Sequence, residues 1–176
     1  MIAPFPIVCP GYRVEILGAP DAPRLQPLFE ACSDYALLES GEPTPANAAA
    51  CEFEATPPGR TTPDKFMIGL LNDEDRMVGL IAADRGWPEA HGWWIGLLLI
   101  DPQQRGTGLA RSFVEAFFEW IQGQAAQSVA LAVFDENKRA TRFWRGLDFV
   151  HVRSTEPRVI GKKTHVLHVM RRELTN

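Results

Sequence analysis

The chain has 176 residues, of which 45% are hydrophobic and 23% are charged, and its formal net charge is −4. That length supports one well-cored domain and not comfortably two, and the negative charge argues against nucleic acid or an anionic membrane as the main partner. The three cysteines are odd in number and lack a C-x-x-C spacing, which excludes a disulfide framework and a zinc site. No apolar stretch is long enough to span a membrane, and the N-terminus lacks the pattern of a signal peptide. We therefore expect a cytoplasmic protein without a bound metal.

The first third of the chain predicts a strand followed by helices. Three prolines within the first ten residues predict an irregular lead-in over residues 1–10, and we expect the domain to cover residues 11–176. Alternating polar and apolar side chains over residues 12–16 predict the first strand. Apolar spacing and capping residues predict helices over residues 22–32, 33–40 and 46–54.

The middle of the chain predicts three strands. Residues 66–71 and 77–83 are apolar runs joined by a polar turn, which is typical of a hairpin. Residues 93–100 form the next apolar run. Gly96 interrupts it and marks either a bulge that opens the sheet or a simple packing position.

The turn that follows residue 100 indicates an anion site. It leads directly into a helical apolar pattern that begins at Leu109. A strand, a tight turn and a helix N-terminus in that order favour anions, because the first amides of a helix have no partner within it. Gly106 and Gly108 have no side chain to keep a phosphate from the backbone, and Arg105 adds a fixed positive charge.

A second pattern lies downstream. Residues 129–134 are typical of a strand, and Asn137 is a suitable N-cap for the short helix that follows. The apolar positions on one face of this helix are Ala140, Phe143, Trp144 and Leu147. Residues 149–153 and 159–172 then predict a closing hairpin.

Two familiar phosphate motifs do not fit the glycine turn. It lacks the Gly-Lys-Ser/Thr of a Walker loop, and Arg111 stands where a dinucleotide fingerprint needs a small residue. The sequence Gln103-x-x-Gly106-x-Gly108 resembles instead the coenzyme A pyrophosphate loop of the GCN5-related N-acetyltransferases (the GNAT superfamily). The downstream pattern is similar to the later motif of that family through Asn137, Ala140, Phe143, Leu147 and Phe149. Two motifs in the right order are far more specific than either alone.

The resemblance implies an α/β (α+β) fold with a mixed, mostly antiparallel central sheet, splayed open after its fourth strand and flanked by helices. Acyl-coenzyme A would occupy the opening, where its pantetheine amides pair with backbone groups that the splay leaves unpaired. The residues that we expect to bind the coenzyme are Leu98, Leu99, Ile100, Gln103, Gln104, Arg105, Gly106, Thr107, Gly108, Leu109, Ala110, Asn137, Arg139, Ala140, Phe143 and Trp144.

The implied activity is N-acetyl transfer from acetyl-CoA, as co-substrate, to the amine of a small molecule, by direct attack in a ternary complex. A thioester is already activated, so no metal is needed. Two positions depart from the family. Trp144 stands where a tyrosine often protonates the departing thiolate, and Trp94 stands where many members have a glutamate base. An indole N–H can do neither near neutral pH, so a non-catalytic acyl-CoA sensor or scaffold with the same fold remains an alternative.

The acceptor side is less defined. The candidates for the general base are His91, Asp84 and Glu89, and His91 has the best unperturbed pKa for the work. The aromatic candidates for lining an acceptor pocket are Tyr35, Trp87 and Trp93, whereas we favour core packing for Trp94. The expected partner is a small-molecule amine, with neither nucleic acid nor membrane, and a homodimer is left open.

Overall fold

The computed structural model describes residues 9–57, 59–60 and 64–174, so nearly all of the predicted lead-in lies outside the described residues. The strands are β1 (Arg13–Leu17), β2 (Lys65–Leu71), β3 (Met77–Arg85), β4 (Gly92–Ile100), β5 (Ser128–Phe134), β6 (Val150–Ser154), β7 (Arg158–Ile160), β8 (Lys163–His165) and β9 (Leu167–Glu173). The helices are α1 (Ala22–Ala31), α2 (Ser33–Ser40), α3 (Ala48–Glu54), α4 (Leu109–Gln122) and α5 (Lys138–Arg145), with short 3-10 turns η1 (Ala19–Asp21) and η2 (Pro102–Gln104). No helix among these residues is both long and apolar enough to cross a membrane.

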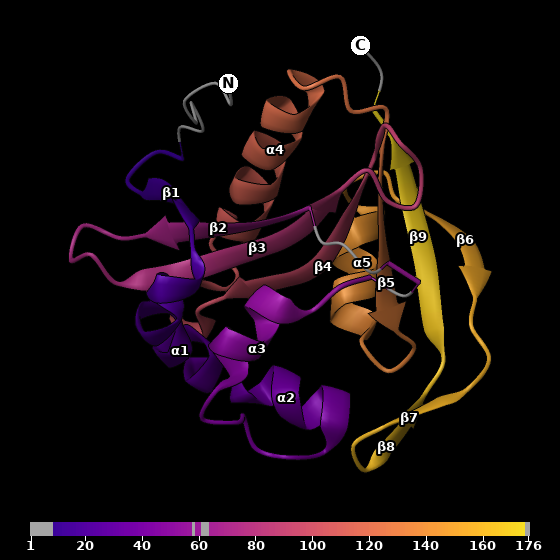
Figure 1. The fold of residues 1–176 in the computed structure, drawn as a ribbon, viewed down its shortest axis with the longest axis horizontal. Coiled ribbons are helices and arrows are strands. Elements are labelled where there is room, and N and C mark those ends of the chain that lie inside the picture. Colours follow the sequence, from indigo (N-terminus) through magenta and orange to yellow (C-terminus); the bar gives the residue numbers. More distant parts are fainter. Residues whose placement is uncertain (1–8, 58, 61–63, 175–176) are drawn as a thin grey trace.

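One seven-stranded sheet runs through the molecule in the order β1-β2-β3-β4-β5-β9-β6 (Figure 1). Its neighbours pair antiparallel, except for β4 and β5, which are parallel. This confirms the predicted mixed, mostly antiparallel sheet.

The C-terminal hairpin differs from its prediction. The expected strand over residues 159–172 is broken, and its first part folds back on itself as the separate hairpin β7–β8. The turn of that hairpin is at Gly161, with φ +57°. Beside it, the amide of Lys162 donates to the carbonyl of Ser40 at 2.7 Å. This contact fixes the hairpin to the end of α2, which the sequence pattern does not reveal.

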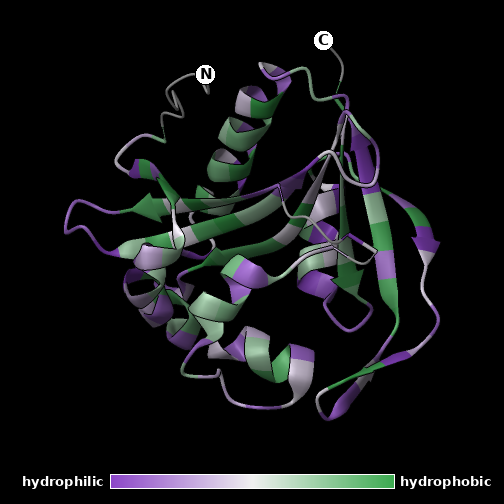
Figure 2. Cartoon of the chain, viewed as in Figure 1, coloured by the Kyte–Doolittle hydropathy of each residue, from purple (hydrophilic) through white to green (hydrophobic). Residues whose placement is uncertain are grey.

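Helices cover both faces of the sheet. In Figure 1, α4 lies above strands β2–β4 and α1–α3 lie below them. The face toward α4 and α5 carries the larger apolar core, whereas α1 and α3 cover a second one. Figure 2 shows apolar residues along β3 and β4, which are covered on both sides. Burial on both faces explains why these strands are nearly continuous apolar runs.

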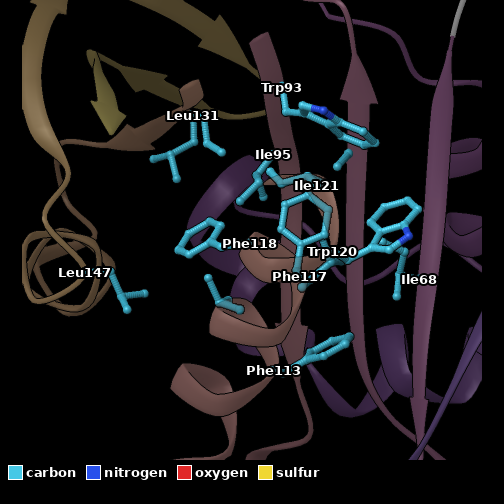
Figure 3. Close-up of a cluster of buried hydrophobic side chains, with 14 of the residues drawn as sticks. Ile68, Trp93, Ile95, Phe113, Phe117, Phe118, Trp120, Ile121, Leu131 and Leu147 are labelled. Carbon is cyan, nitrogen blue, oxygen red and sulfur yellow. The ribbon is translucent and has the colours of Figure 1, made fainter. Parts of the chain in front are cut away.

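Helix α4 anchors the larger core because its apolar side chains recur with helical spacing. Figure 3 shows Phe113, Phe117 and Trp120 projecting from α4 toward the strands. The helix therefore holds its N-terminus at a fixed place beside the end of β4.

Candidate functional site

The sheet opens between β4 and β5. Only residues 92–95 of β4 pair with residues 128–131 of β5. Beyond that point residues 97–100 keep only β3 as a neighbour, and residues 132–134 keep only β9. The predicted splay after the fourth strand is thus confirmed. Buried backbone groups without partners are costly, so this gap suits a ligand that carries amides of its own.

Gly96 is a bulge residue. The consecutive residues Ala82 and Ala83 of β3 lie opposite Leu97 and Ile95 of β4, which leaves Gly96 as an extra residue. A bulge reverses the alternation of side chains along a strand. Before the bulge, the odd-numbered Trp93 and Ile95 face α4. After it, the odd-numbered Leu97 and Leu99 face α1–α3. Of the two explanations for Gly96, the bulge is confirmed.

A cleft of about 530 Å³ occupies the opening. Most of the residues expected to bind the coenzyme line it, namely Leu98, Leu99, Ile100, Gln104, Arg105, Gly106, Gly108, Ala110, Asn137, Arg139, Ala140, Phe143 and Trp144. The cleft thus joins the free edge of β4, the glycine turn and α5 in one continuous surface.

Three of the expected coenzyme residues are not in the lining. Gln103 is exposed, and its backbone N–H donates to the Asp101 carboxylate at 2.8 Å. Thr107 is also exposed, and its hydroxyl donates to the carbonyl of Gln104 at 2.7 Å. Leu109 is buried in the larger core. These residues shape the turn from outside the cleft.

Other lining residues were missed from the sequence. They are Ile95, Gly96, Leu97 and Arg111, together with the end of β5 from Leu131 to Phe134. The parallel pairing of β4 and β5 places the ends of both strands at the same edge, and recognising that pairing would have pointed to β5. Arg111 is already engaged, because its guanidinium donates to Glu115 at 2.9 Å and to the carbonyl of Gly146.

The glycine turn leaves its backbone open to the cleft. Gly106 and Gly108 have φ of +78° and +89°, and a Cβ atom on either would meet nothing within 4 Å. The amide of Ser112 donates to the carbonyl of Gly108 at 3.1 Å, as the first bond of the α4 ladder. The amides of residues 109–111 precede that bond and have no partner within the helix. The turn therefore has the backbone geometry of an anion site.

Arg105 is tied to α2 instead of standing free. Its Nη1 and Nη2 donate to the Asp34 carboxylate at 2.6 and 3.1 Å, and its Nε donates to the carbonyl of Ile100 at 3.0 Å. The hydrogen bond from Arg105 is the main reason that the pKa of Asp34 is lowered. Arg139 of α5 lies 3.6 Å from the same carboxylate. Asp34 thus links α2 to both walls of the cleft.

Helix α5 begins as predicted. The side-chain oxygen of Asn137 accepts from the amide of Ala140 at 3.1 Å, which confirms the N-cap. Trp144 is buried, with ring centroids 4.9 Å from Phe143 and 5.2 Å from Phe149. Its place in the cleft lining is therefore held by aromatic packing.

The three base candidates lie in different surroundings, and none is in the cleft lining. His91 is exposed just before β4, at the end of the strand opposite to the glycine turn. Glu89 is exposed in the preceding loop, where Arg171 donates to it at 2.6 and 3.1 Å and lowers its pKa. Asp84 is 2% exposed and lies opposite Trp94 in the β3–β4 register. Burial is the main cause that raises the pKa of Asp84.

The aromatic candidates also separate. Tyr35 lines the cleft, and its ring centroid is 6.3 Å from that of Phe134. Trp93 is 1% exposed and lies among core rings on the α4 side of the sheet (Figure 3), so it is a core residue and not part of an acceptor pocket. The expectation of core packing for Trp94 is not met either, because that residue is half-buried and belongs to neither of the two apolar cores. Trp87 is half-buried in the loop before β4, outside the lining.

Comparisons with known proteins agree with this geometry. Residues 26–149, more than half of the chain, match the model of the Acetyltransferase (GNAT) family. An acetyltransferase from Thermus thermophilus is similar in structure, with a TM-score of 0.74 and 23% identity over 94% of this chain and 98% of that one. No curated protein matches the sequence.

Two further solved structures are similar. The ribosomal-protein-S18-alanine N-acetyltransferase from Escherichia coli has a TM-score of 0.68 and 12% identity, over 94% of this chain and 95% of that one. A GCN5-related N-acetyltransferase from Kribbella flavida has a TM-score of 0.67 and 20% identity, over 93% and 98%. At these identities, the likeness to solved structures shows the fold alone.

Proposed function

The chain belongs to the GNAT acetyltransferase family, whose members transfer acyl groups from acyl-CoA, and we propose that it acetylates the amine of a small molecule by direct attack in a ternary complex. The observation that carries the proposal is the open edge of β4 over residues 97–100, which ends at the glycine turn. Pantetheine amides would pair with that edge like an added strand. The pyrophosphate would lie at the turn, where the space that a Cβ atom on Gly106 or Gly108 would occupy is open to 4 Å.

The amine must lose a proton before it attacks. Of the three candidates, we assign this step to Asp84, because it lies opposite Trp94 in the β3–β4 register, its buried Oδ1 has no hydrogen-bond partner, and its raised pKa makes its carboxylate a stronger base. In the step, an N–H bond of the ammonium breaks and an O–H bond forms on the carboxylate. The neutral nitrogen then forms the amide bond as the C–S bond of the thioester breaks. Holding the two reactants together contributes most of the acceleration.

The leaving thiolate needs no acid from the chain. Trp144 has only an indole N–H to offer. Thiols titrate near 8.5, so the thiolate leaves as such and takes the second proton that the attacking nitrogen releases. The protonated Asp84 returns its proton to water, which balances the reaction.

A second candidate is an acyl-CoA sensor or scaffold that binds the donor without turnover. The tryptophans at positions 94 and 144 favour it, because neither can move a proton near neutral pH. The two candidates share the same cleft and differ only in what happens after the donor binds.

Thiol release from acetyl-CoA, measured over a panel of small amines, separates them. We expect release that depends on the acceptor and exceeds hydrolysis, and we expect Asp84→Asn to lower kcat while the affinity for coenzyme A stays unchanged. Glu119→Gln, on the exposed side of α4, is the control. Tight coenzyme A binding without turnover on any amine would contradict acyl transfer and support the sensor or scaffold.

The three cysteines are unpaired, as in a reducing compartment, and we place the reaction in the cytoplasm.

A further inference from the structure

The side chain of Gln104, in the lining of the donor cleft, is held by a residue from the edge of the sheet. The hydroxyl of Tyr12, just before β1, donates to the Oε1 of Gln104 at 2.9 Å. The two residues are 92 positions apart, and two strands lie between β1 and β4 in the sheet. Tyr12 packs against the larger core, so it crosses the sheet on the side that α4 covers. A distant part of the chain thus reaches the glycine turn.

The other polar groups of Gln104 are engaged as well, except for its side-chain nitrogen. Its backbone N–H donates to the carbonyl of Asp101 at 2.8 Å, and its own carbonyl accepts from the hydroxyl of Thr107 at 2.7 Å. In the described part of the chain, no group accepts a hydrogen bond from Nε2. This nitrogen is not among the buried atoms without a partner, so its two N–H groups are accessible to a ligand in the cleft.

The hydrogen bond from Tyr12 decides which end of this carboxamide remains available. A carboxamide carries an acceptor oxygen and a donor nitrogen on one planar group. Because the phenol occupies Oε1, the end that is left over is the donor. In the reversed orientation the oxygen would be left over, and an oxygen with only lone pairs would repel a phosphate. Without the phenol, rotation of the side chain would allow both orientations.

We propose that the Nε2 of Gln104 donates to the pyrophosphate of the donor, and that Tyr12 is a positioning residue that orients this group. Gln104 precedes Gly106 by two residues, and both line the cleft at the turn. Hydrogen bonds to an anionic oxygen are stronger than those between neutral groups, and a side chain that is already oriented loses less freedom on binding. The inference rests on the proposed function and concerns its donor-binding step alone.

Two variants of Gln104 test the contact, with coenzyme A binding measured by calorimetry. Gln104→Met keeps the length of the side chain and removes its N–H groups, so we expect the affinity to fall about tenfold to hundredfold, as for a hydrogen bond to a charged group. Gln104→Glu keeps an oxygen for Tyr12 and places a second one where the nitrogen was, so we expect a larger loss. An affinity within about threefold of the wild type in both variants would overturn the contact.

A double-mutant cycle tests that Tyr12 acts through Gln104. Tyr12→Phe should weaken coenzyme A binding about threefold to tenfold in the wild type and should have no further effect in Gln104→Met. An equal loss in both backgrounds would overturn the positioning role. Thr44→Val is the matched control, because it also removes a half-buried hydroxyl, which donates to the carbonyl of Phe29 at 3.4 Å, outside the cleft lining. It should leave the affinity unchanged.

Dephospho-coenzyme A identifies the phosphate, since it lacks the 3′-phosphate and keeps the pyrophosphate. The Gln104 variants should lose the same affinity for it as for coenzyme A, and losses confined to coenzyme A would overturn the pyrophosphate contact. None of these measurements depends on turnover. The expected losses without thiol release on any amine would support the inference and overturn the proposed acyl transfer. Unchanged affinity in all variants, with normal thiol release, would overturn the inference and support acyl transfer.

Discussion

At the scale of single residues, the chemistry of the site depends on which side chains are free to react. Tyr12 and Tyr35 are the only tyrosines in the chain. The hydroxyl of Tyr12 donates to the Gln104 side chain at 2.9 Å. Tyr35 lines the cleft, but burial and two nearby carboxylates raise its pKa. We therefore expect neither phenol to stand in for the tyrosine that the family often has at the position of Trp144.

Trp144→Phe should therefore keep kcat within about tenfold of the wild type, apart from losses in packing, because the indole transfers no proton. The rate should rise with pH until the acceptor amine is neutral, without a falling basic limb. A pH profile of kcat for both proteins checks this. A basic limb that disappears in Tyr35→Phe would contradict the account.

Gly106→Ala should weaken coenzyme A binding at least about tenfold, since the new methyl group enters the open side of the turn. Gly11 is a matched control, because it also has positive φ, +81°, and empty space at its Cβ position. Both alanine variants carry a backbone cost of about 1–3 kcal/mol, but only Gly106→Ala should lose affinity in calorimetry. An equal affinity in the two variants would mean that the turn does not hold the pyrophosphate.

At the scale of elements, two contacts fix the helices that form the walls of the cleft. Asn137 caps α5, and Asp34 ties α2 to the end of β4 through Arg105. Asn137 is also expected to contact the donor, whereas the role of Asp34 is structural.

Asn137→Ala should cost about 0.5–2 kcal/mol of unfolding free energy, because the first turn of α5 loses its cap. It should also raise the KM for acetyl-CoA if the side chain contacts the donor. Asn137→Ser keeps much of the cap and shortens the reach, so denaturation and kinetics on this variant separate the roles. Full stability with an unchanged KM for acetyl-CoA in Asn137→Ser would show that Asn137 caps α5 and does not contact the donor.

The Asp34–Arg105 pair should stabilise the fold in a pH-dependent way. The folded pKa of Asp34 is lowered, so its contribution is present above the unfolded value and is lost as the pH falls through the folded one. The Asp34 side chain is 50% exposed, so we expect less than about 1 kcal/mol. Urea denaturation of Asp34→Asn against wild type should show this difference at pH 7, and the difference should disappear only as the pH falls well below about 4, toward the lowered folded pKa. Asp73→Asn, in an exposed turn, should show no such trend.

At the scale of the whole molecule, the sheet consists of two parts that meet along a short seam. Strands β1–β4 and β5-β9-β6 are joined through the pairing of residues 92–95 with 128–131. A donor that fills the opening would therefore complete the sheet as well as occupy the cleft.

Coenzyme A at about 100 times its Kd should stabilise the protein by about 2.7 kcal/mol. Hydrogen exchange should slow most at residues 97–100, because the donor supplies the partners that their free edge lacks. Calorimetric unfolding and exchange mass spectrometry with and without coenzyme A measure the two effects. Protection confined to the glycine turn would show that the donor does not pair with β4.

The sequence alone determined most of the order of the elements, and it pointed to the turn and the helix that line the cleft. Apolar periodicity located the strands and α4, and Asn137 and the glycines of the turn act locally, through their own backbone or the next few residues. Local interactions of this kind depend on residues that are close in sequence, so a sequence pattern can predict them.

Only the tertiary structure decided which residues from distant parts of the chain contact one another. The bulge at Gly96 reverses the alternation along β4, so Trp93 and Ile95 face one core whereas Leu97 and Leu99 face the other. Arg105 meets Asp34 from 71 positions away, and His165 meets Glu39 from 126. Such contacts follow from how the layers stack, since packing brings together residues whose separation along the chain carries no signal.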